Sequence, residues 1–157
     1  MRRKLPKILI TGGAGFIGSE FVRTITGHFP SKLKGSSLKE SVPFRPELIV
    51  VDNLTYAGDL KRLEEGKGKF KFYKCDICNK NGVRIIFERE KPDIVINFAA
   101  STHVDRSIQD ARPFIETNVE GVQVLLDAAR NFGIKKIIQI STDEVYGDII
   151  KGKFSED

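Results

Sequence analysis

The chain has few of the residues that build metal-bound or disulfide-stapled domains. Its 157 residues include only two cysteines and two histidines. Cys75 and Cys78 form one C-x-x-C pair, but a structural zinc site needs four ligands, and His28 and His103 lie in unrelated contexts. A redox dithiol is the alternative, although such a pair normally opens a helix in a different setting. We interpret both cysteines as free thiols in a reducing compartment and expect no metal.

Long apolar runs are also missing. No run approaches the roughly 20 residues of a membrane span. The basic start at residues 1–4 resembles that of a signal peptide, but the apolar stretch at 8–10 is too short before glycines intervene. We therefore expect no membrane attachment and a cytoplasmic location.

A strong charge of one sign is absent as well. The net charge is +5, and the lysines are spread along the chain. We interpret them as a solvated surface. Nucleic-acid binding is the alternative, but no basic helix, aromatic-basic module or zinc finger accompanies the charge. We therefore expect no nucleic-acid partner.

What the chain does have is a regular alternation of apolar runs and helical patterns, which indicates a parallel sheet with crossover helices. We expect strands at 7–11, 47–52, 69–74, 93–98 and 136–141. The third run alternates lysine with aromatic residues, as edge strands do when lysines face water. The prediction is an α/β fold: a doubly wound parallel sheet in the order 3-2-1-4-5, where strand three is an edge.

Helices are expected between these strands. An apolar face follows the first strand from residue 16, and another helix precedes strand four near 83–87. The longest helix is expected over 113–132, with Pro113 in its first turn and Gly133 past its end. Residues 27–45 break the rhythm, and we interpret them as a tolerated surface-loop insertion rather than a functional loop. The length suits one domain.

A glycine-rich loop lies between the first strand and the first helix. It satisfies G-x-G-x-x-G through Gly13, Gly15 and Gly18, and G-x-x-G-x-x-G when Gly12 replaces Gly13. The glycines let the backbone approach a pyrophosphate, and the helix N-terminus supplies oriented N–H groups. Because the strand–loop–helix context is present, the motif predicts a dinucleotide site.

Acidic and small residues end the next strands. Asp52 ends strand two, where a carboxylate can accept hydrogen bonds from ribose hydroxyls and repel a 2′-phosphate, which favours NAD over NADP. It lies 34 residues after Gly18, against the usual ~20, and the 27–45 insertion accounts for the surplus. The alternative is a strand-end turn residue. Asp76 and Ile77 follow strand three, where they could contact adenine. Ala99 and Ala100, at the end of strand four, are small enough to leave room for a dinucleotide.

The segment Thr142-Asp143-Glu144 follows strand five. Adjacent carboxylates repel, so that one tends to hold its proton while the other ionises. Such a pair can supply a general acid and a general base.

Six motifs, in order, resemble the amino-terminal half of the dTDP-glucose 4,6-dehydratases. They are TGGAGFIGSE, VDNLTYAG, CDI, NFAASTHVDRSI, ETNVEG and ISTDEVYGD. This family belongs to the extended short-chain dehydrogenase/reductases, which have a Rossmann fold. The resemblance implies NAD-dependent conversion of a nucleotide-diphosphate sugar, dTDP-glucose, to its 4-keto-6-deoxy form.

The resemblance also implies residue roles. Asp143 is the acid that protonates the departing C6 hydroxyl, Glu144 is the base at C5, and Thr142 bonds near the sugar C4 oxygen. Thr102 touches the substrate as well as the cofactor. The implied NAD site comprises the glycines of the loop and the following residues: Phe16, Ile17, Asp52, Asn53, Leu54, Thr55, Asp76, Ile77, Phe98, Ala99, Ala100, Ser101, Thr102 and Thr117. The roles of His103, Asp105 and Arg106 stay open.

Three features depart from the family pattern. Ser101 stands where glutamate is usual, and Asn53 where lysine is common, although Asp-Asn also occurs in related epimerases. The family's Tyr-x-x-x-Lys pair is missing, since the residues four after Tyr56, Tyr73 and Tyr146 are leucine or isoleucine. The expectation is an incomplete NAD-binding domain over 1–157, truncated before the later strands and the sugar-binding domain and inactive alone. A homodimer through the 113–132 helix is also implied.

Two alternatives remain open. One is a nucleotide-sugar 4-epimerase or decarboxylase of the same fold, although epimerases typically carry small hydroxyl residues where Asp143 and Glu144 stand. The other is a non-catalytic NAD-binding module, which the missing Tyr-x-x-x-Lys pair supports and the Thr142–Glu144 segment opposes.

Overall fold

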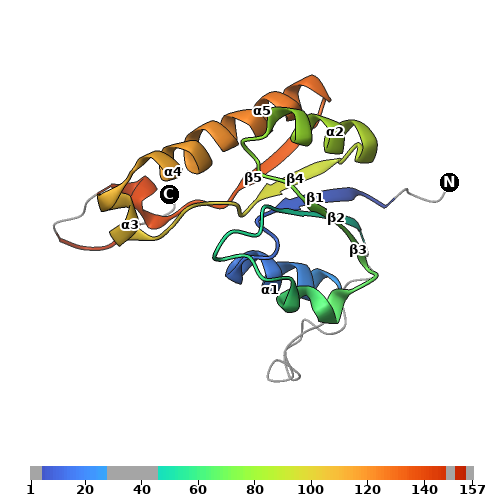
Figure 1. The fold of residues 1–157 in the computed structure, drawn as a ribbon, viewed down its shortest axis with the longest axis horizontal. Helices are drawn as coiled ribbons and strands as arrows, with labels where there is room; N and C mark the ends of the chain where they lie inside the picture. Colours follow the sequence, from blue (N-terminus) through green and yellow to red (C-terminus); the bar gives the residue numbers. More distant parts are fainter. Residues whose placement is uncertain (1–4, 28–45, 148–150, 155–157) are drawn as a thin grey trace.

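A single parallel sheet organises the chain. The computed structural model describes residues 5–27, 46–147 and 151–154, so the insertion expected at 27–45 lies, from residue 28 on, outside the described residues. The strands run in the order β3-β2-β1-β4-β5 (Figure 1), which confirms the predicted fold class and order. Their bounds are β1 Lys7–Thr11, β2 Glu47–Asp52, β3 Phe70–Lys74, β4 Ile94–Asn97 and β5 Lys136–Gln139.

Helices cover both faces of the sheet (Figure 1). On one side lie α1 (Phe16–Ile25) and the 3₁₀ helix η3 (Leu60–Gly66), and on the other lie α2 (Lys80–Glu90) and α5 (Val122–Asn131). Because successive strand residues point to opposite faces, Ile10 and Val50 pack in the α1 core, whereas Leu9 and Ile49 pack in the α2–α5 core. This two-sided burial explains why the strands are continuously apolar.

The long helix differs from the expectation in one respect. Instead of one α-helix over 113–132, the structure contains α4 (Arg112–Ile115), a π-helical segment η4 (Glu116–Gly121) and then α5. A short helix, α3 (Val104–Gln109), precedes this run. None of the helices in the described ranges combines the length and apolar character that crossing a bilayer requires.

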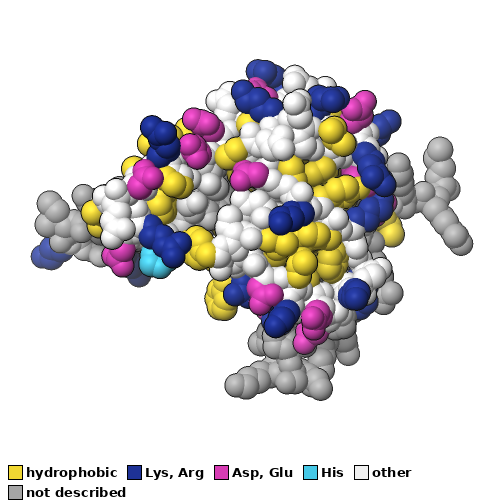
Figure 2. Space-filling view, in the orientation of Figure 1, with side chains coloured by type: hydrophobic (Ala, Val, Ile, Leu, Met, Phe, Trp, Pro, Cys, Tyr) yellow, Lys and Arg dark blue, Asp and Glu magenta, His cyan; other side chains and the backbone are white. Residues whose placement is uncertain are grey.

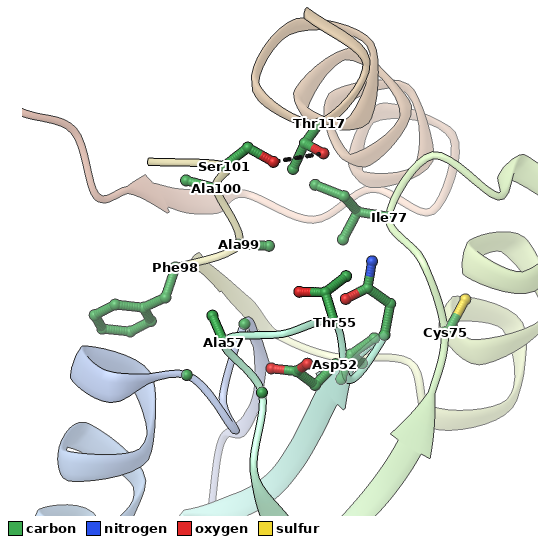
Figure 3. A pocket seen from close by; sticks show the side chains of 15 residues that line it. Asp52, Thr55, Ala57, Cys75, Ile77, Phe98, Ala99, Ala100, Ser101 and Thr117 are labelled. Atoms are coloured by element: carbon green, nitrogen blue, oxygen red, sulfur yellow. Dashed lines mark hydrogen bonds between the residues drawn. The ribbon is translucent and has the colours of Figure 1, made fainter. Parts of the chain in front are cut away.

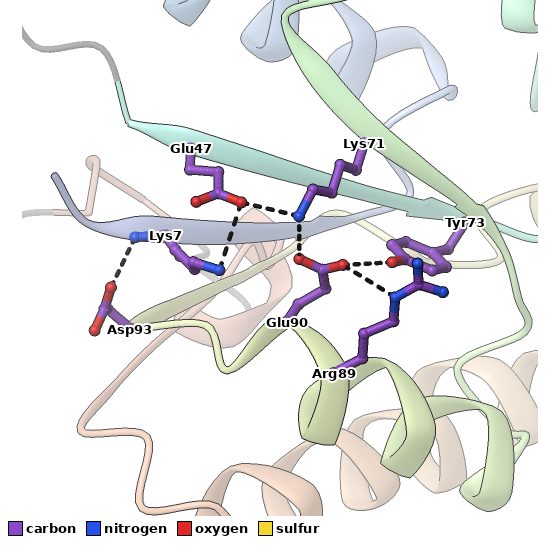
Figure 4. Close-up of polar contacts among 7 residues, drawn as sticks. All are labelled: Lys7, Glu47, Lys71, Tyr73, Arg89, Glu90 and Asp93. Atoms are coloured by element: carbon purple, nitrogen blue, oxygen red, sulfur yellow. Dashed lines mark hydrogen bonds and ion pairs between the residues drawn. The ribbon is translucent and has the colours of Figure 1, made fainter.

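An ion network ties the edge strand β3 to the end of α2 (Figure 4). The Glu90 carboxylate is almost fully buried and accepts hydrogen bonds from Lys71 Nζ at 2.7 Å and Tyr73 Oη at 2.5 Å. Lys71 also pairs with Glu47 at 3.0 Å, and Lys7 pairs with the same Glu47 at 3.4 Å. The middle lysine of the edge strand, expected only to face water, therefore joins three elements.

The surface carries both signs of charge. On the face shown in Figure 2, basic and acidic side chains are interspersed rather than separated into regions of one sign. Such a mixed surface agrees with the interpretation that the excess lysine and arginine side chains are solvated.

Candidate functional site at the carboxyl ends of the strands

A cleft opens where β1, β2, β3 and β4 end (Figure 3). Its volume is roughly 550 Å³ when the space open to solvent is included, and it lies where open α/β sheets bind ligands. Eleven residues expected at the cofactor line it: Gly12, Gly15, Asp52, Asn53, Thr55, Ile77, Phe98, Ala99, Ala100, Ser101 and Thr117.

The glycine loop leads into the N-terminus of α1 and contributes Gly12 and Gly15 to the cleft lining. Gly12 has φ +65°, and a Cβ there would lie 2.5 Å from the Ala99 backbone nitrogen. Gly18 does not line the cleft; a Cβ there would collide with the Gly12 carbonyl, so this glycine allows α1 to pack on the loop. Phe16 and Ile17, at the start of α1, are 83% and 63% exposed and also lie outside the lining.

Asp52 joins the end of β2 to the glycine loop. Its carboxylate is buried, and its oxygens accept the N–H groups of Ala14 at 2.9 Å and Leu54 at 2.8 Å. Leu54 has a positive φ of 56° and lies outside the cleft lining. The turn role and the cleft position, treated as alternatives from sequence, therefore coexist. A carboxylate has about four acceptor positions, and the hydrogen bonds from Ala14 and Leu54 occupy two of them within the described part of the chain.

A second bridge joins the loops after β2 and β3. Asn53 donates to Asp76 Oδ2 at 2.9 Å, and the Cys78 N–H donates to Asp76 Oδ1 at 2.8 Å. Burial alone would raise the pKa of Asp76, but these hydrogen bonds outweigh it and lower the pKa. Asp76 borders the adjoining groove on the α2 side rather than the cleft. The Asn53 that departs from the family pattern thus fixes the position of this acid.

Both cysteines are free thiols beside the cleft. Cys75 lines it, a position that was not predicted. Burial, together with the nearby Asp76 charge, raises the pKa of Cys75, and burial with the nearby acidic charges raises that of Cys78 to about 11. A raised pKa keeps a thiol protonated and a poor nucleophile.

Asn97, directly before the cleft-lining Phe98, supports the site without having been predicted from the sequence. It is almost fully buried, accepts from the Thr11 hydroxyl and the Ala99 N–H, and donates to Gln139. It therefore holds together the carboxyl ends of β1, β4 and β5. One feature of the sequence could have indicated this role: Asn97 is a single amide in an otherwise apolar strand. A buried strand tolerates a polar side chain when that side chain is hydrogen-bonded. Val51, Ala57 and Gly58 also line the cleft without having been predicted.

The outer rim is formed by Tyr56 and the start of α3. The Arg106 guanidinium lies 4.4 Å from the centre of the Tyr56 ring, and the His103 ring lies 6.3 Å from it. Thr55 and Ala57, on either side of Tyr56, line the cleft. These contacts join the loop after β2 to the segment after β4, which gives His103 and Arg106 a position at the rim.

The segment after β5 lies at the same edge of the sheet. Thr142 is exposed, and a 3₁₀ turn follows over Asp143–Tyr146. The side chains of Asp143 and Glu144 lie outside what the structure describes, so their acid and base roles remain predictions. Thr102 is exposed beyond the cleft lining, and its substrate contact also remains a prediction.

Fold and cleft together define a doubly wound α/β protein of the Rossmann type. Residues 9–157 match the family model described as GDP-mannose 4,6 dehydratase, and the chain belongs to that family.

Known relatives narrow the class. The chain is 41% identical over 155 residues to a dTDP-glucose 4,6-dehydratase of Streptomyces griseus, covering 96% of this chain and 42% of that protein. It is 40% identical to the mouse dTDP-D-glucose 4,6-dehydratase, covering 39% of that protein. The chain thus spans about two fifths of the length of these relatives.

Two solved structures are also similar. A Streptomyces venezuelae dTDP-glucose 4,6-dehydratase with NAD and TYD bound matches with a TM-score of 0.75 and 40% identity, over 94% of this chain and 43% of that one. The UDP-Glc/GlcNAc 4-epimerase of Campylobacter jejuni matches with a TM-score of 0.78 and 33% identity, over 96% and 41%. The class is therefore that of nucleotide-sugar dehydratases and epimerases.

Proposed function

We propose that the cleft binds NAD. The observation that carries this proposal is the meeting, in one cleft, of the glycine loop, the Asp52 carboxylate and the residues after β4. The pyrophosphate lies at the N-terminus of α1, where free N–H groups and the helix dipole favour anions. The ribose hydroxyls bond to the acceptor positions of Asp52 that Ala14 and Leu54 leave free.

The remaining contacts follow the same placement. Adenine lies against Ile77 near Asp76, and the nicotinamide half extends along Phe98–Thr102 toward Thr117. Phe16 and Ile17 cover the dinucleotide from the start of α1, where their exposed side chains are free to do so. The 157 residues thus form an NAD-binding domain. The dehydratase similar to this chain has NAD bound in its solved structure, which supports the proposal.

The whole protein, we infer, dehydrates dTDP-glucose to the 4-keto-6-deoxy sugar. When bound, NAD supplies oxidation of the sugar at C4 and reduction at C6. In the elimination, Glu144 takes the C5 proton and Asp143 gives its proton to the C6 hydroxyl, so that the C6–O bond breaks and water leaves with formation of the C5=C6 bond. Thr142 and Thr102 hydrogen-bond the sugar.

The Asp143–Glu144 pair favours a dehydratase over an epimerase. Only elimination needs a proton donor and a proton acceptor at neighbouring carbons. The Streptomyces griseus and mouse relatives, 41% and 40% identical to this chain, are dTDP-glucose 4,6-dehydratases, whereas the epimerase structure is 33% identical, which supports the same choice.

Turnover by these 157 residues alone is not expected. None of the three tyrosines has a lysine four positions later, so none has the neighbouring cation that would favour a phenolate base. The proposal for this chain is therefore NAD binding without conversion of dTDP-glucose.

Calorimetric titration of NAD into the chain tests the proposal. Gly12→Ala should abolish measurable binding, because its Cβ would lie 2.5 Å from the Ala99 nitrogen in the cleft wall. Gly68→Ala is the matched control: Gly68 also has a positive φ, +84°, but a Cβ there meets nothing within 4 Å. Equal NAD affinities for the two variants would contradict the proposed site. Adding dTDP-glucose or UDP-glucose should yield no 4-keto product.

We also propose that the chain pairs with a second copy along the outer face of the 112–131 helical run. Ile115, Val119 and Leu126, spread along this run, are each half-exposed or more, and exposed apolar side chains of this kind are typical of a surface that a partner covers. Light scattering should show a dimer for the wild type and a monomer for Val119→Lys. Glu120→Lys, its exposed neighbour, is the control and should remain dimeric.

A further inference from the structure

The π-helical segment Glu116–Gly121 contacts two of the segments that line the cleft, those after β3 and β4. A π turn contains one residue more than an α turn, is rare, and occurs often at functional sites. Here it interrupts a helix at the level of Ile77 and Ser101, which line the cleft from opposite sides. The extra residue changes which side chains face these loops.

On the side of the loop after β4, the Asn118 side chain forms hydrogen bonds with both the backbone N–H and the backbone carbonyl of Ser101. The Ser101 N–H donates to Asn118 Oδ1 at 2.8 Å, and Asn118 Nδ2 donates to the Ser101 carbonyl at 2.9 Å. Since a backbone N–H only donates and a carbonyl only accepts, one orientation of the carboxamide satisfies both. The preceding Thr117 meets the Ser101 hydroxyl at 3.3 Å (Figure 3).

The same segment contacts the loop after β3 through its backbone, at Glu116 and Gly121. The Cys78 thiol donates to the Glu116 carbonyl at 3.2 Å. Gly121 packs directly on Ile77, because a Cβ there would lie 2.5 Å from Ile77 Cδ1. One helical segment therefore sets the positions of two cleft walls that otherwise belong to separate strands.

We propose that Asn118 is a positioning residue for the NAD cleft. It is absent from the lining and acts through Ser101, holding the Phe98–Thr102 segment in the conformation that faces the cofactor. The inference rests on the proposed NAD site. The π turn places both Thr117 and Asn118 against Ser101, so that side chain and backbone are held together.

Two variants and two readouts test the inference. Asn118→Ala removes both hydrogen bonds, and Asn118→Leu removes them while keeping the volume and a good helix former. Asn131→Ala, an exposed asparagine at the end of the same helical run, is the control. Loss of a reciprocal hydrogen-bonded pair corresponds to about a tenfold weaker NAD affinity, which calorimetry measures. Hydrogen exchange of the Ser101 amide is followed without NAD.

The expected result is weaker NAD binding in both Asn118 variants, with faster exchange confined to residues 99–102 and no change in the control. Wild-type affinity in either variant would overturn the inference. Faster exchange throughout the sheet would also overturn it, because Asn118 would then support the fold as a whole. If the wild type itself binds no NAD, the proposed function fails, whereas the exchange of Ser101 still shows whether Asn118 holds this segment.

Discussion

Replacing Glu90 with glutamine should destabilise the fold well beyond an ordinary surface change. Glu90 is 2% exposed and accepts hydrogen bonds from Lys71 and Tyr73. Glutamine keeps the volume but removes the charge and places an NH₂ group against donors. Hydrogen bonds to a buried charge contribute about 1.5–3 kcal/mol. Lys71 retains Glu47 as a partner at 3.0 Å, so we expect a loss near the middle, about 2 kcal/mol.

The matched control is Glu88→Gln on the same helix. Glu88 is 62% exposed and pairs with Arg84 at 2.9 Å one turn away, and such surface pairs contribute about 0.3–0.5 kcal/mol. Urea unfolding at pH 7 measures both variants. In thermal unfolding, the Glu90 variant should melt roughly 4–8 °C below the wild type. Equal losses for the two variants would refute the assignment of Glu90 as the centre of the network.

The pH dependence gives a second test of the same residue. Burial alone would raise the pKa of Glu90, but the hydrogen bonds from Lys71 and Tyr73 lower it below its usual value. Because the pKa of Glu90 is lower in the folded state, its ionised carboxylate stabilises the fold at pH values above the unfolded pKa of about 4.3. This stabilisation is lost as the pH falls through the pKa of Glu90 in the folded state. The stability gap between wild type and Glu90→Gln should therefore narrow below about pH 4. A gap that widens on acidification would contradict the sign.

Three further predictions concern the cleft. Tyr56→Leu should speed NAD dissociation several-fold in stopped-flow measurements, whereas Tyr56→Phe should not, because the Arg106 contact at 4.4 Å needs only the aromatic ring. Equal dissociation rates for the two variants would show that this contact does not retain NAD. With its pKa near 11, Cys78 should react with iodoacetamide at pH 7.5 about a hundredfold more slowly than a free thiol, and faster as the pH rises; a wild-type rate matching free cysteine would contradict its protonated state. Gly121→Ala should lower the melting temperature, since the clash with Ile77 exceeds the roughly 1 kcal/mol gain in helix propensity; a higher melting temperature would refute the packing argument.

The sheet could be predicted from the sequence because its signals are local. Apolar runs gave all five strands to within two residues at each end, and the lysine–aromatic alternation of β3 marked the edge. The glycine loop and Asp52 lie where their motif predicted, since strand, loop and helix follow one another in the chain.

The missed features depend on pairing between distant residues. The 113–132 pattern contains nothing that distinguishes a π turn from an α turn, and Asn118 meets Ser101 only once β4 and the helix are in place. Asn97 and Glu90 likewise have partners on other elements. Asn97 bonds to Gln139, 42 residues away in the chain, and Glu90 bonds to Lys71, 19 residues away. A buried polar side chain is recognised by its partner, and the partner is known only from the fold.

The central claim is that this cleft is an NAD site governed by Asp52. Titrating NAD and NADP into the chain under identical conditions tests it most directly. We predict that NAD binds at least about tenfold more tightly than NADP, because a 2′-phosphate would face the Asp52 carboxylate, and that Asp52→Asn removes most of this preference. Binding of neither nucleotide, or equal affinity for both in the wild type, would contradict the account.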